Sequence, residues 1–131
     1  MTYLLDSNVL IALLLPDHVH HEPARQWVLR DVDRHASCPI TQGALLRTAI
    51  RAGATAVQAQ RLLAAMLADD RHAFWPDQIG YGQVPVTGVI GHRQVTDAYL
   101  AELARARGGR LATFDQGLVE IHRDVADLVP T

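Results

Sequence analysis

The sequence predicts an α/β fold with a central parallel sheet of about five strands and helices on both faces. Short apolar runs of strand length alternate along the chain with longer segments that have the spacing of amphipathic helices. This alternation is typical of β-α-β units, whose right-handed crossovers place successive strands parallel in one sheet. We expect the strands at residues 3–5, 36–38, 73–75, 111–114 and 126–129.

The helices between these strands follow from apolar spacing and from residues that begin or end helices. Ser7 and Asn8 are good N-cap residues for an apolar helix over residues 9–15. A glycine pair ends a helix that we expect over residues 94–107. Glycines and prolines in residues 76–91 predict a loop with one strand-like turn. The other helices are expected over residues 21–34, 41–51, 54–67 and 116–122.

Composition and charge narrow the kind of protein. The chain has 131 residues, of which 49% are hydrophobic and 20% charged, so we expect residues 1–131 to form a single globular domain. No apolar run is long enough for a membrane span, no secretion signal is visible and Cys38 is the single cysteine, which together favour the cytoplasm. All 12 basic residues are arginines, which bind phosphate as a bidentate fork, although the net charge of −2 does not itself indicate a nucleic-acid partner.

Three aspartates lie where a parallel sheet usually carries its site. Asp6 ends the first predicted strand and Asp115 follows a later one, and open parallel sheets bind ligands beyond the carboxyl ends of their strands. Asp97 lies near the start of a long predicted helix, where the positive end of the helix dipole favours an anion. Three crowded carboxylates repel one another, so they need protons or a divalent cation, and Mg²⁺ and Mn²⁺ prefer such oxygen ligands.

Each aspartate also has an ordinary structural explanation. Asp6 and Asp115 each precede a predicted helix and suit its N-cap. Asp97, taken alone, suits a solvated position on a helix surface. The spacing by itself therefore leaves both a metal site and three structural carboxylates open.

The same residues resemble a known family. The segments 4–11 (LLDSNVLI), 95–100 (VTDAYL) and 111–115 (LATFD) resemble the PIN-domain family, and more closely the VapC toxins of bacterial toxin–antitoxin pairs. Segments 21–27 and 38–47 also look like one VapC subgroup. Each motif is weak by itself, but the three in this order are specific.

The resemblance covers nearly the whole chain and implies both a fold and an activity. It implies a PIN-like three-layer fold and a Mg²⁺-dependent endoribonuclease that inhibits translation and growth. Family members hold the metal with four acids, of which Asp6, Asp97 and Asp115 match three. In such a site the ion lowers the pKa of a bound water and stabilises the charge of the attacked phosphodiester.

Gln42 stands where the family's fourth acid, a glutamate, would be. The Gln42 amide oxygen is able to contact a hard cation, but it brings no charge. We therefore expect weaker metal binding and slower chemistry rather than a broken fold. The sequence leaves open whether this glutamine is natural or engineered.

Further residues near the predicted site suit substrate positioning. Ser7, Asn8 and Thr113 are placed to orient water or phosphate by hydrogen bonds. Arg47 and Arg93 are placed to bind backbone phosphates, although ordinary surface charge explains them equally well.

The resemblance also implies partners. A cognate VapB-type antitoxin would mask the protein, a homodimer is expected, and the substrate would be RNA of the tRNA, rRNA or mRNA class. We expect part of the apolar surface of the helices after Asp6 and at residues 57–66 to meet such a partner. The RNA target, the cut position and the number of metal ions stay open.

Other functions were weighed against this one. The serious rival is a catalytically weakened or silent PIN domain that binds RNA or antitoxin without cutting, because Gln42 lacks the glutamate's charge. A response-regulator receiver would need a lysine, and the chain has none. A dinucleotide-binding domain would need a Gly-x-Gly-x-x-Gly turn after the first strand, which is also missing.

Overall fold

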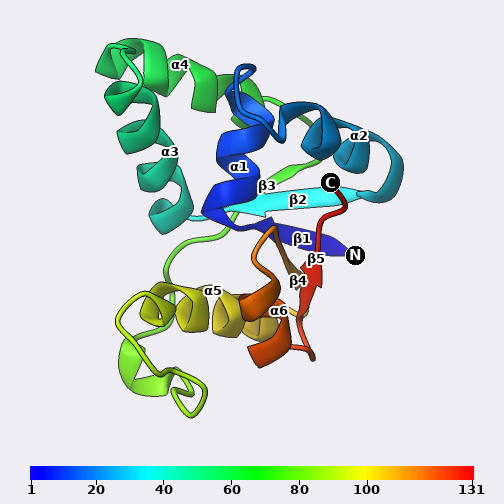
Figure 1. Ribbon diagram of the computed structural model, residues 1–131, viewed down its shortest axis with the longest axis vertical. Helices are drawn as coiled ribbons and strands as arrows, with labels where there is room; N and C mark the ends of the chain where they lie inside the picture. The colour runs from blue at the N-terminus through cyan, green and yellow to red at the C-terminus, as the bar shows by residue number, and fades with distance from the viewer.

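Five parallel strands form the centre of the computed structural model, which describes all 131 residues (Figure 1). The strand order is β3-β2-β1-β4-β5, and every neighbouring pair is parallel. The predicted α/β fold class is therefore confirmed. The strands are β1 (Thr2–Leu5), β2 (Arg34–Ser37), β3 (His72–Phe74), β4 (Arg110–Thr113) and β5 (Ala126–Leu128).

Helices cover both faces of this sheet. Figure 1 shows a larger group of helices on one side of the sheet and a smaller group on the other. The larger group is α1 (Ser7–Leu14), α2 (His21–Asp31), α3 (Pro39–Arg51) and α4 (Ala56–Leu67). The smaller group is α5 (Gln94–Ala106) and α6 (Gln116–Ile121).

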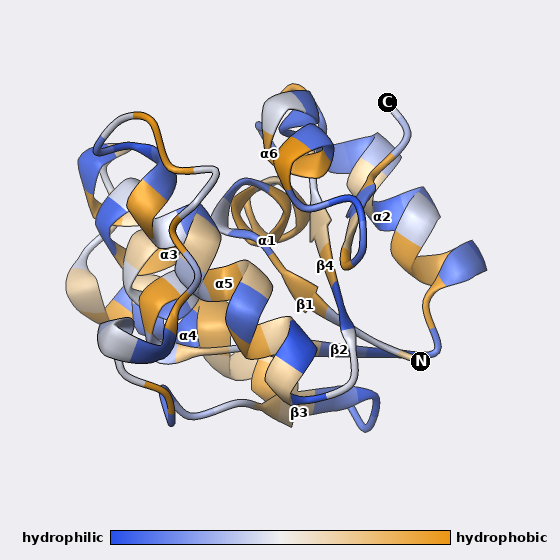
Figure 2. Cartoon of the chain, turned by 90° about the horizontal axis from the view of Figure 1, so that it is seen from below, coloured by the Kyte–Doolittle hydropathy of each residue, from blue (hydrophilic) through white to orange (hydrophobic).

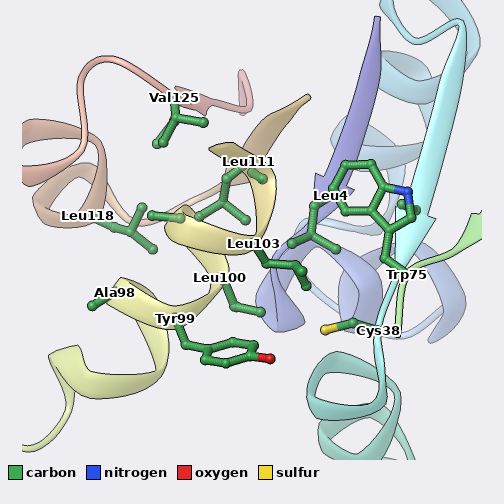
Figure 3. Close-up of a cluster of buried hydrophobic side chains, with 14 of the residues drawn as sticks. Leu4, Cys38, Trp75, Ala98, Tyr99, Leu100, Leu103, Leu111, Leu118 and Val125 are labelled. Atoms are coloured by element: carbon green, nitrogen blue, oxygen red, sulfur yellow. The ribbon is translucent and has the colours of Figure 1, made fainter. Parts of the chain in front are cut away.

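Because both faces are covered, alternate residues of a central strand enter two separate cores. Leu4 of β1 packs in the core beneath α5 and α6, and Leu5 packs in the core beneath the other four helices. Both side chains are fully buried. Figure 3 shows Leu100 and Leu103 of α5 beside Leu4 in the first of these cores. A strand buried on both faces reads as a continuous apolar run, which is why the start of the sequence is so hydrophobic.

The most hydrophobic elements lie in the middle of the molecule. Figure 2 shows the hydrophobic colouring concentrated on α1 and β1, with polar surfaces on the outer helices. No helix is long and apolar enough to cross a membrane.

The first helix begins earlier than predicted. It starts at Ser7, and its N-cap is Asp6 rather than Ser7 or Asn8. The Asp6 carboxylate accepts a hydrogen bond from the Ser7 backbone N–H at 2.7 Å. Because β1 ends at Leu5, the side chain directly after the strand is the first one placed to take a free helix amide.

Two other predicted helices had misplaced ends. α2 ends at Asp31 rather than at residue 34, because Arg34 pairs with Thr2 in the β1–β2 ladder. α3 begins at Pro39 rather than Thr41, since the first helical position needs no backbone N–H.

The prediction of a strand-like turn within residues 76–91 was wrong. That segment contains a 3₁₀ turn at Tyr81–Gln83, which the Gln83 side chain closes by accepting a hydrogen bond from the Gly80 N–H.

The predicted helix at residues 54–67 begins at Ala56 instead, because Thr55 forms its capping box.

The order of the strands fixes where a site can form. From β1 the chain moves outward to β2 and β3, and then returns to the other side of β1 to form β4 and β5. The direction of winding therefore reverses between β1 and β4, and ligands of open parallel sheets bind at such a switch point. Asp6 and Asp115 follow these two strands directly.

Candidate active site

Asp6 is the most buried of the three predicted aspartates, with 7% of its surface exposed. One of its oxygens accepts from the Ser7 N–H, and the other accepts from the Thr113 hydroxyl, both at 2.7 Å. Burial raises the pKa of Asp6, the two hydrogen bonds oppose that rise and the charge of Asp115 adds to it. Asp6 is thus a fixed, buried carboxyl group with an acidic neighbour and no cationic partner.

Thr113 joins the ends of β1 and β4. Its hydroxyl donates to Asp6 and accepts from the Asp115 backbone N–H at 3.0 Å and from the Asn8 side-chain amide at 3.4 Å. Asn8 in turn accepts from the Phe114 N–H at 3.3 Å. In the structure the polar groups of Thr113 and Asn8 hold the aspartates and the end of β4, and their role in orienting water or phosphate stays a prediction.

Asp115 is exposed and caps α6, accepting from the Leu118 N–H at 3.1 Å. The capping explanation considered for Asp6 and Asp115 is therefore correct for both residues. It does not compete with a site, because each cap uses one carboxylate oxygen, and the other Asp115 oxygen makes no hydrogen bond.

Asp97 lies in the first turn of α5 and is partly buried. Its pKa is raised to about 6, first by burial and then by the charges of Asp6 and Asp115. The sheet and α5 therefore bring the three predicted carboxylates into one electrostatic neighbourhood. Their mutual repulsion helps to raise the pKa of Asp97, and a bound cation would remove that repulsion.

The donor set suits a hard cation, with one restriction. No three acidic, histidine or cysteine side chains converge closely enough to hold one ion. Mg²⁺ in proteins usually keeps several waters and takes only one or two carboxylates directly. Oxygen donors that are close but not converging fit that ion better than they fit zinc, which is enclosed by four tight ligands.

Gln42 lies in the first turn of α3, just beyond the carboxyl end of β2. Its amide nitrogen donates to the Ser37 hydroxyl at 3.0 Å, and no hydrogen bond joins it to the three aspartates. Ser37 also bonds His72 at 3.0 Å, and His72 bonds His35 at 3.0 Å. Sequence reasoning missed these three partners, because the predicted strand began at residue 36 and left out His35, which shares a face with Ser37 in β2.

The remaining predicted residues lie at the surface. Arg47 and Arg93 are exposed and neither forms an ion pair, so both guanidinium groups are free to bind phosphate. The Arg47 guanidinium lies close to Gly43, one turn earlier in α3. A Cβ atom added at Gly43 would be 3.3 Å from one of its nitrogens. The Ser7 hydroxyl is partly exposed and makes no hydrogen bond.

A parallel sheet with buried and repelling aspartates at its switch point defines an α/β protein with an acidic site suited to a hard cation. The PIN-domain family model matches residues 3–124. The chain therefore belongs to the PIN-domain family, within its VapC group, as the sequence motifs predicted.

Individual relatives support the assignment of the chain to the VapC group. The chain is 52% identical over 131 residues to Ribonuclease VapC29 of Mycobacterium tuberculosis, a match that covers all of this chain and 98% of the relative. The crystal structure of VapC20 from M. tuberculosis, described as a sarcin–ricin loop cleaving toxin, matches with a TM-score of 0.75 and 13% identity, covering 99% of this chain and all of that one. VapBC2 from Rickettsia felis, solved bound to a DNA fragment from its promoter, matches with a TM-score of 0.69 and 16% identity over the same shares. At these identities the two solved structures support the fold alone.

Proposed function

We propose that this chain is a Mg²⁺-dependent endoribonuclease toxin that a cognate VapB-type antitoxin neutralises, with residues 1–131 acting as one unit. The observation that carries the proposal is the placement of Asp6, Asp97 and Asp115 around the switch point of the sheet without a basic partner, where burial and the other two charges raise the pKa of Asp97 to about 6. The 52% identity to a protein named a ribonuclease supports the substrate class. Strongly shifted carboxyl groups in a polar site are a common property of catalytic centres.

In this proposal the three aspartates hold the ion. Asp6, Asp97 and Asp115 would hold Mg²⁺, or Mn²⁺ in its place. When bound, such an ion would supply an activated water molecule and offset negative charge on the phosphodiester. The protein's own contribution is to hold Asp6 rigidly, which Thr113 and the Ser7 N–H do.

Substrate contacts come from the exposed rim around the aspartates. Arg47 and Arg93 bind phosphates of the RNA backbone, and the Ser7 hydroxyl is available to a phosphate or water beside Asp6. Such contacts position the RNA without reading its sequence. The RNA class, whether tRNA, rRNA or mRNA, is then set by the shape of the strand that fits this rim.

The expected biology follows the VapC relatives. The 52% identity to a VapC ribonuclease supports a VapB-type partner for this chain, and VapBC2 of R. felis is a solved VapBC assembly that shares the fold. We further propose a homodimer in the cytoplasm, where the single buried Cys38 stays reduced and where cutting RNA inhibits translation and growth.

One observation favours the rival function. Gln42 has no charge, and its amide nitrogen is already bonded to Ser37. A PIN domain with a weakened site could bind RNA or antitoxin without cutting, and the same assay separates the two functions.

The test is cleavage of total cellular RNA by antitoxin-free protein, with Mg²⁺ and with EDTA. We expect cleavage that needs Mg²⁺ and that Asp6→Asn or Asp97→Asn abolishes, with Gln42→Glu cutting faster than the wild type. Cleavage by Gln42→Glu alone would make the natural chain a binding protein. Full cleavage by Asp6→Asn would refute the proposed site.

A further inference from the structure

Gln42 is the first member of a continuous polar chain that runs along one face of β2 and β3. Its Nε2 bonds Ser37 Oγ, Ser37 Oγ bonds His72 Nε2, and His72 Nδ1 faces His35 Nδ1, each at 3.0 Å. At the far end, His35 Nε2 lies 3.8 Å from an Asp69 carboxylate oxygen. The chain thus leads from the rim of the candidate site to a partly exposed acid.

The strand register builds this chain. His35 and Ser37 are two apart in β2, so both side chains leave the same face of the sheet. His35 is paired with His72 across the β2–β3 ladder, which places the two imidazole rings side by side. Ser37 is fully buried and His35 is nearly so, so neither has water as an alternative partner.

The charge of Asp69 sets the direction of every bond in the chain. The Arg71 backbone N–H and guanidinium lower the pKa of Asp69, so its carboxylate is ionised at neutral pH. A negative oxygen favours an N–H rather than a lone pair facing it, so His35 carries its proton on Nε2 and leaves Nδ1 as an acceptor. His72 must then donate from Nδ1 and accept at Nε2.

The remaining directions follow without further choice. Burial lowers the pKa of both histidines, that of His72 to about 4, so both rings are neutral near pH 7. Because His72 Nε2 is an acceptor, the Ser37 hydroxyl donates to it. Ser37 has then used its one proton, and its oxygen accepts from the Gln42 amide nitrogen.

We propose that Ser37, His72 and His35 are positioning residues that fix the orientation of the Gln42 amide, and that this chain requires a donor at position 42. With Nε2 committed to Ser37, the amide oxygen Oε1 is the atom left for the metal site, an inference that rests on the proposed function. Oε1 makes no hydrogen bond and is not a buried unpaired atom, so it is open to solvent or a ligand.

A glutamate at position 42 does not fit this chain as it stands. A carboxylate only accepts hydrogen bonds, so the Ser37 proton would be claimed both by that carboxylate and by His72. If Ser37 turns to the carboxylate, His72 Nε2 loses its donor. The pair then restores its bonds either by reversing both tautomers, which turns a His35 lone pair toward the Asp69 carboxylate, or by taking up a proton, which that carboxylate favours. Gln42 therefore supplies the donor that Ser37 needs, so its presence means more than the loss of a glutamate charge.

The first test reads the bond directions directly in the metal-free protein. Side-chain ¹⁵N NMR distinguishes the two neutral histidine tautomers from the protonated ring. We expect His35 to carry its proton on Nε2 and His72 on Nδ1, at a pH of about 7.5 where neutral histidine prevails. Equal tautomers on the two rings, or a protonated ring, would overturn the proposal.

The second test compares Gln42→Glu with Gln60→Glu, which adds the same charge at an exposed position outside the chain. We expect the histidine pair of Gln42→Glu to take up a proton as the pH falls toward about 6, while Gln60→Glu keeps the wild-type tautomers. Wild-type tautomers and protonation in Gln42→Glu would show that position 42 does not depend on a donor.

The third test connects the chain to the metal. Ser37→Ala frees the Gln42 amide, and losing one hydrogen bond should raise the Mg²⁺ concentration for half-maximal cleavage by about three- to tenfold. Ser37→Thr, which keeps a hydroxyl, should restore the wild-type Mg²⁺ requirement. Thermal melting checks that each variant is folded. An unchanged Mg²⁺ requirement in folded Ser37→Ala would contradict the positioning role.

The two proposals fail in different ways. If the wild type never cuts RNA but the tautomers are as expected, the proposed nuclease function fails and the directional chain stands. If the wild type cuts with Mg²⁺ but the tautomers are wrong, the nuclease stands and the positioning role fails.

Discussion

The sheet holds carboxylates in two opposite environments, one on the edge strand β5 and the other beyond the carboxyl ends of β1 and β4. On β5, Asp127 receives two hydrogen bonds from the Arg110 guanidinium, at 2.6 and 2.8 Å, and one from the Tyr3 hydroxyl at 3.0 Å. These bonds, led by the one from Arg110, lower the pKa of Asp127. At the carboxyl end, Asp6 and Asp97 have raised pKa values and no basic partner.

The difference separates structural acids from functional ones. A carboxylate with an arginine fork is already compensated and ties β4 to β5. A cluster of carboxylates without a cation costs stability in the free protein and is useful only if something binds there. Aspartates of identical chemistry thus have different roles because of what faces them.

The largest expected effect is on activity at the carboxyl end. Asp97→Asn should lower RNA cleavage by at least about a hundredfold, which corresponds to about 3 kcal/mol of transition-state stabilisation. The same change should raise the stability of the metal-free protein at neutral pH by about 1–2 kcal/mol, because it removes a repelled charge. Cleavage assays and urea unfolding measure the two effects, and a loss of both activity and stability would contradict this account.

The matching experiment on the edge strand β5 should give the opposite pattern. Asp127→Asn weakens the Arg110 fork, so we expect a loss of about 1–2 kcal/mol in the free energy of unfolding. Cleavage by the folded variant should stay within about twofold of the wild type, since Asp127 does not belong to the acidic site. A large loss of cleavage in folded Asp127→Asn would remove the contrast between the structural and the functional carboxylates.

The effect of pH on stability sharpens the comparison further. The folded pKa of Asp97 is raised from 3.8 to about 6, so the stability it contributes when protonated is lost as the pH rises through 6. The folded pKa of His72 is lowered from 6.5 to about 4, so its contribution is lost as the pH falls from 6.5 toward 4. The two trends oppose each other in the wild type.

Asp97→Asn should therefore lose more stability than the wild type between about pH 6.5 and 4, because only the histidine trend remains. Urea unfolding at a series of pH values measures this difference. Parallel pH profiles for the two proteins would show that Asp97 does not titrate in that range.

The smallest expected effect is on RNA affinity. Arg47→Ala and Arg93→Ala should each weaken RNA binding by about three- to tenfold and make it less dependent on salt, because each removes one phosphate contact. Binding of an uncleaved RNA to Asp6→Asn protein measures this without turnover. Arg61→Ala, which removes an arginine from the exposed face of α4, serves as the control.

Much of this fold was predictable from local patterns. The apolar run of β1, the Asp6 that follows it and the glycine-terminated helix α5 were all visible in the sequence. The end of α2 was missed because the β1–β2 ladder decides it, through a pairing between residues far apart in the chain. Local propensity carries no information about that register.

The candidate site was predictable to the same depth. Asp6 and Asp115 could be placed on one edge because parallel strands share it, and Asp97 could be placed at the start of a helix. The chain from Gln42 to His72 could not, because Ser37 and His72 are 35 residues apart and meet only through the β2–β3 register. The hydrogen bonds of Thr113 were likewise not predictable, since they depend on the approach of β1 to β4.

The central claim is that the acids at the carboxyl end carry charge that a divalent cation compensates. Thermal melting of the wild type, Asp97→Asn and Asp127→Asn, with and without Mg²⁺ at neutral pH, tests it most directly, because a ligand that binds the folded state raises Tm. The account predicts that Mg²⁺ raises Tm in the wild type and Asp127→Asn, and raises it far less in Asp97→Asn. An equal rise in all three proteins would contradict it.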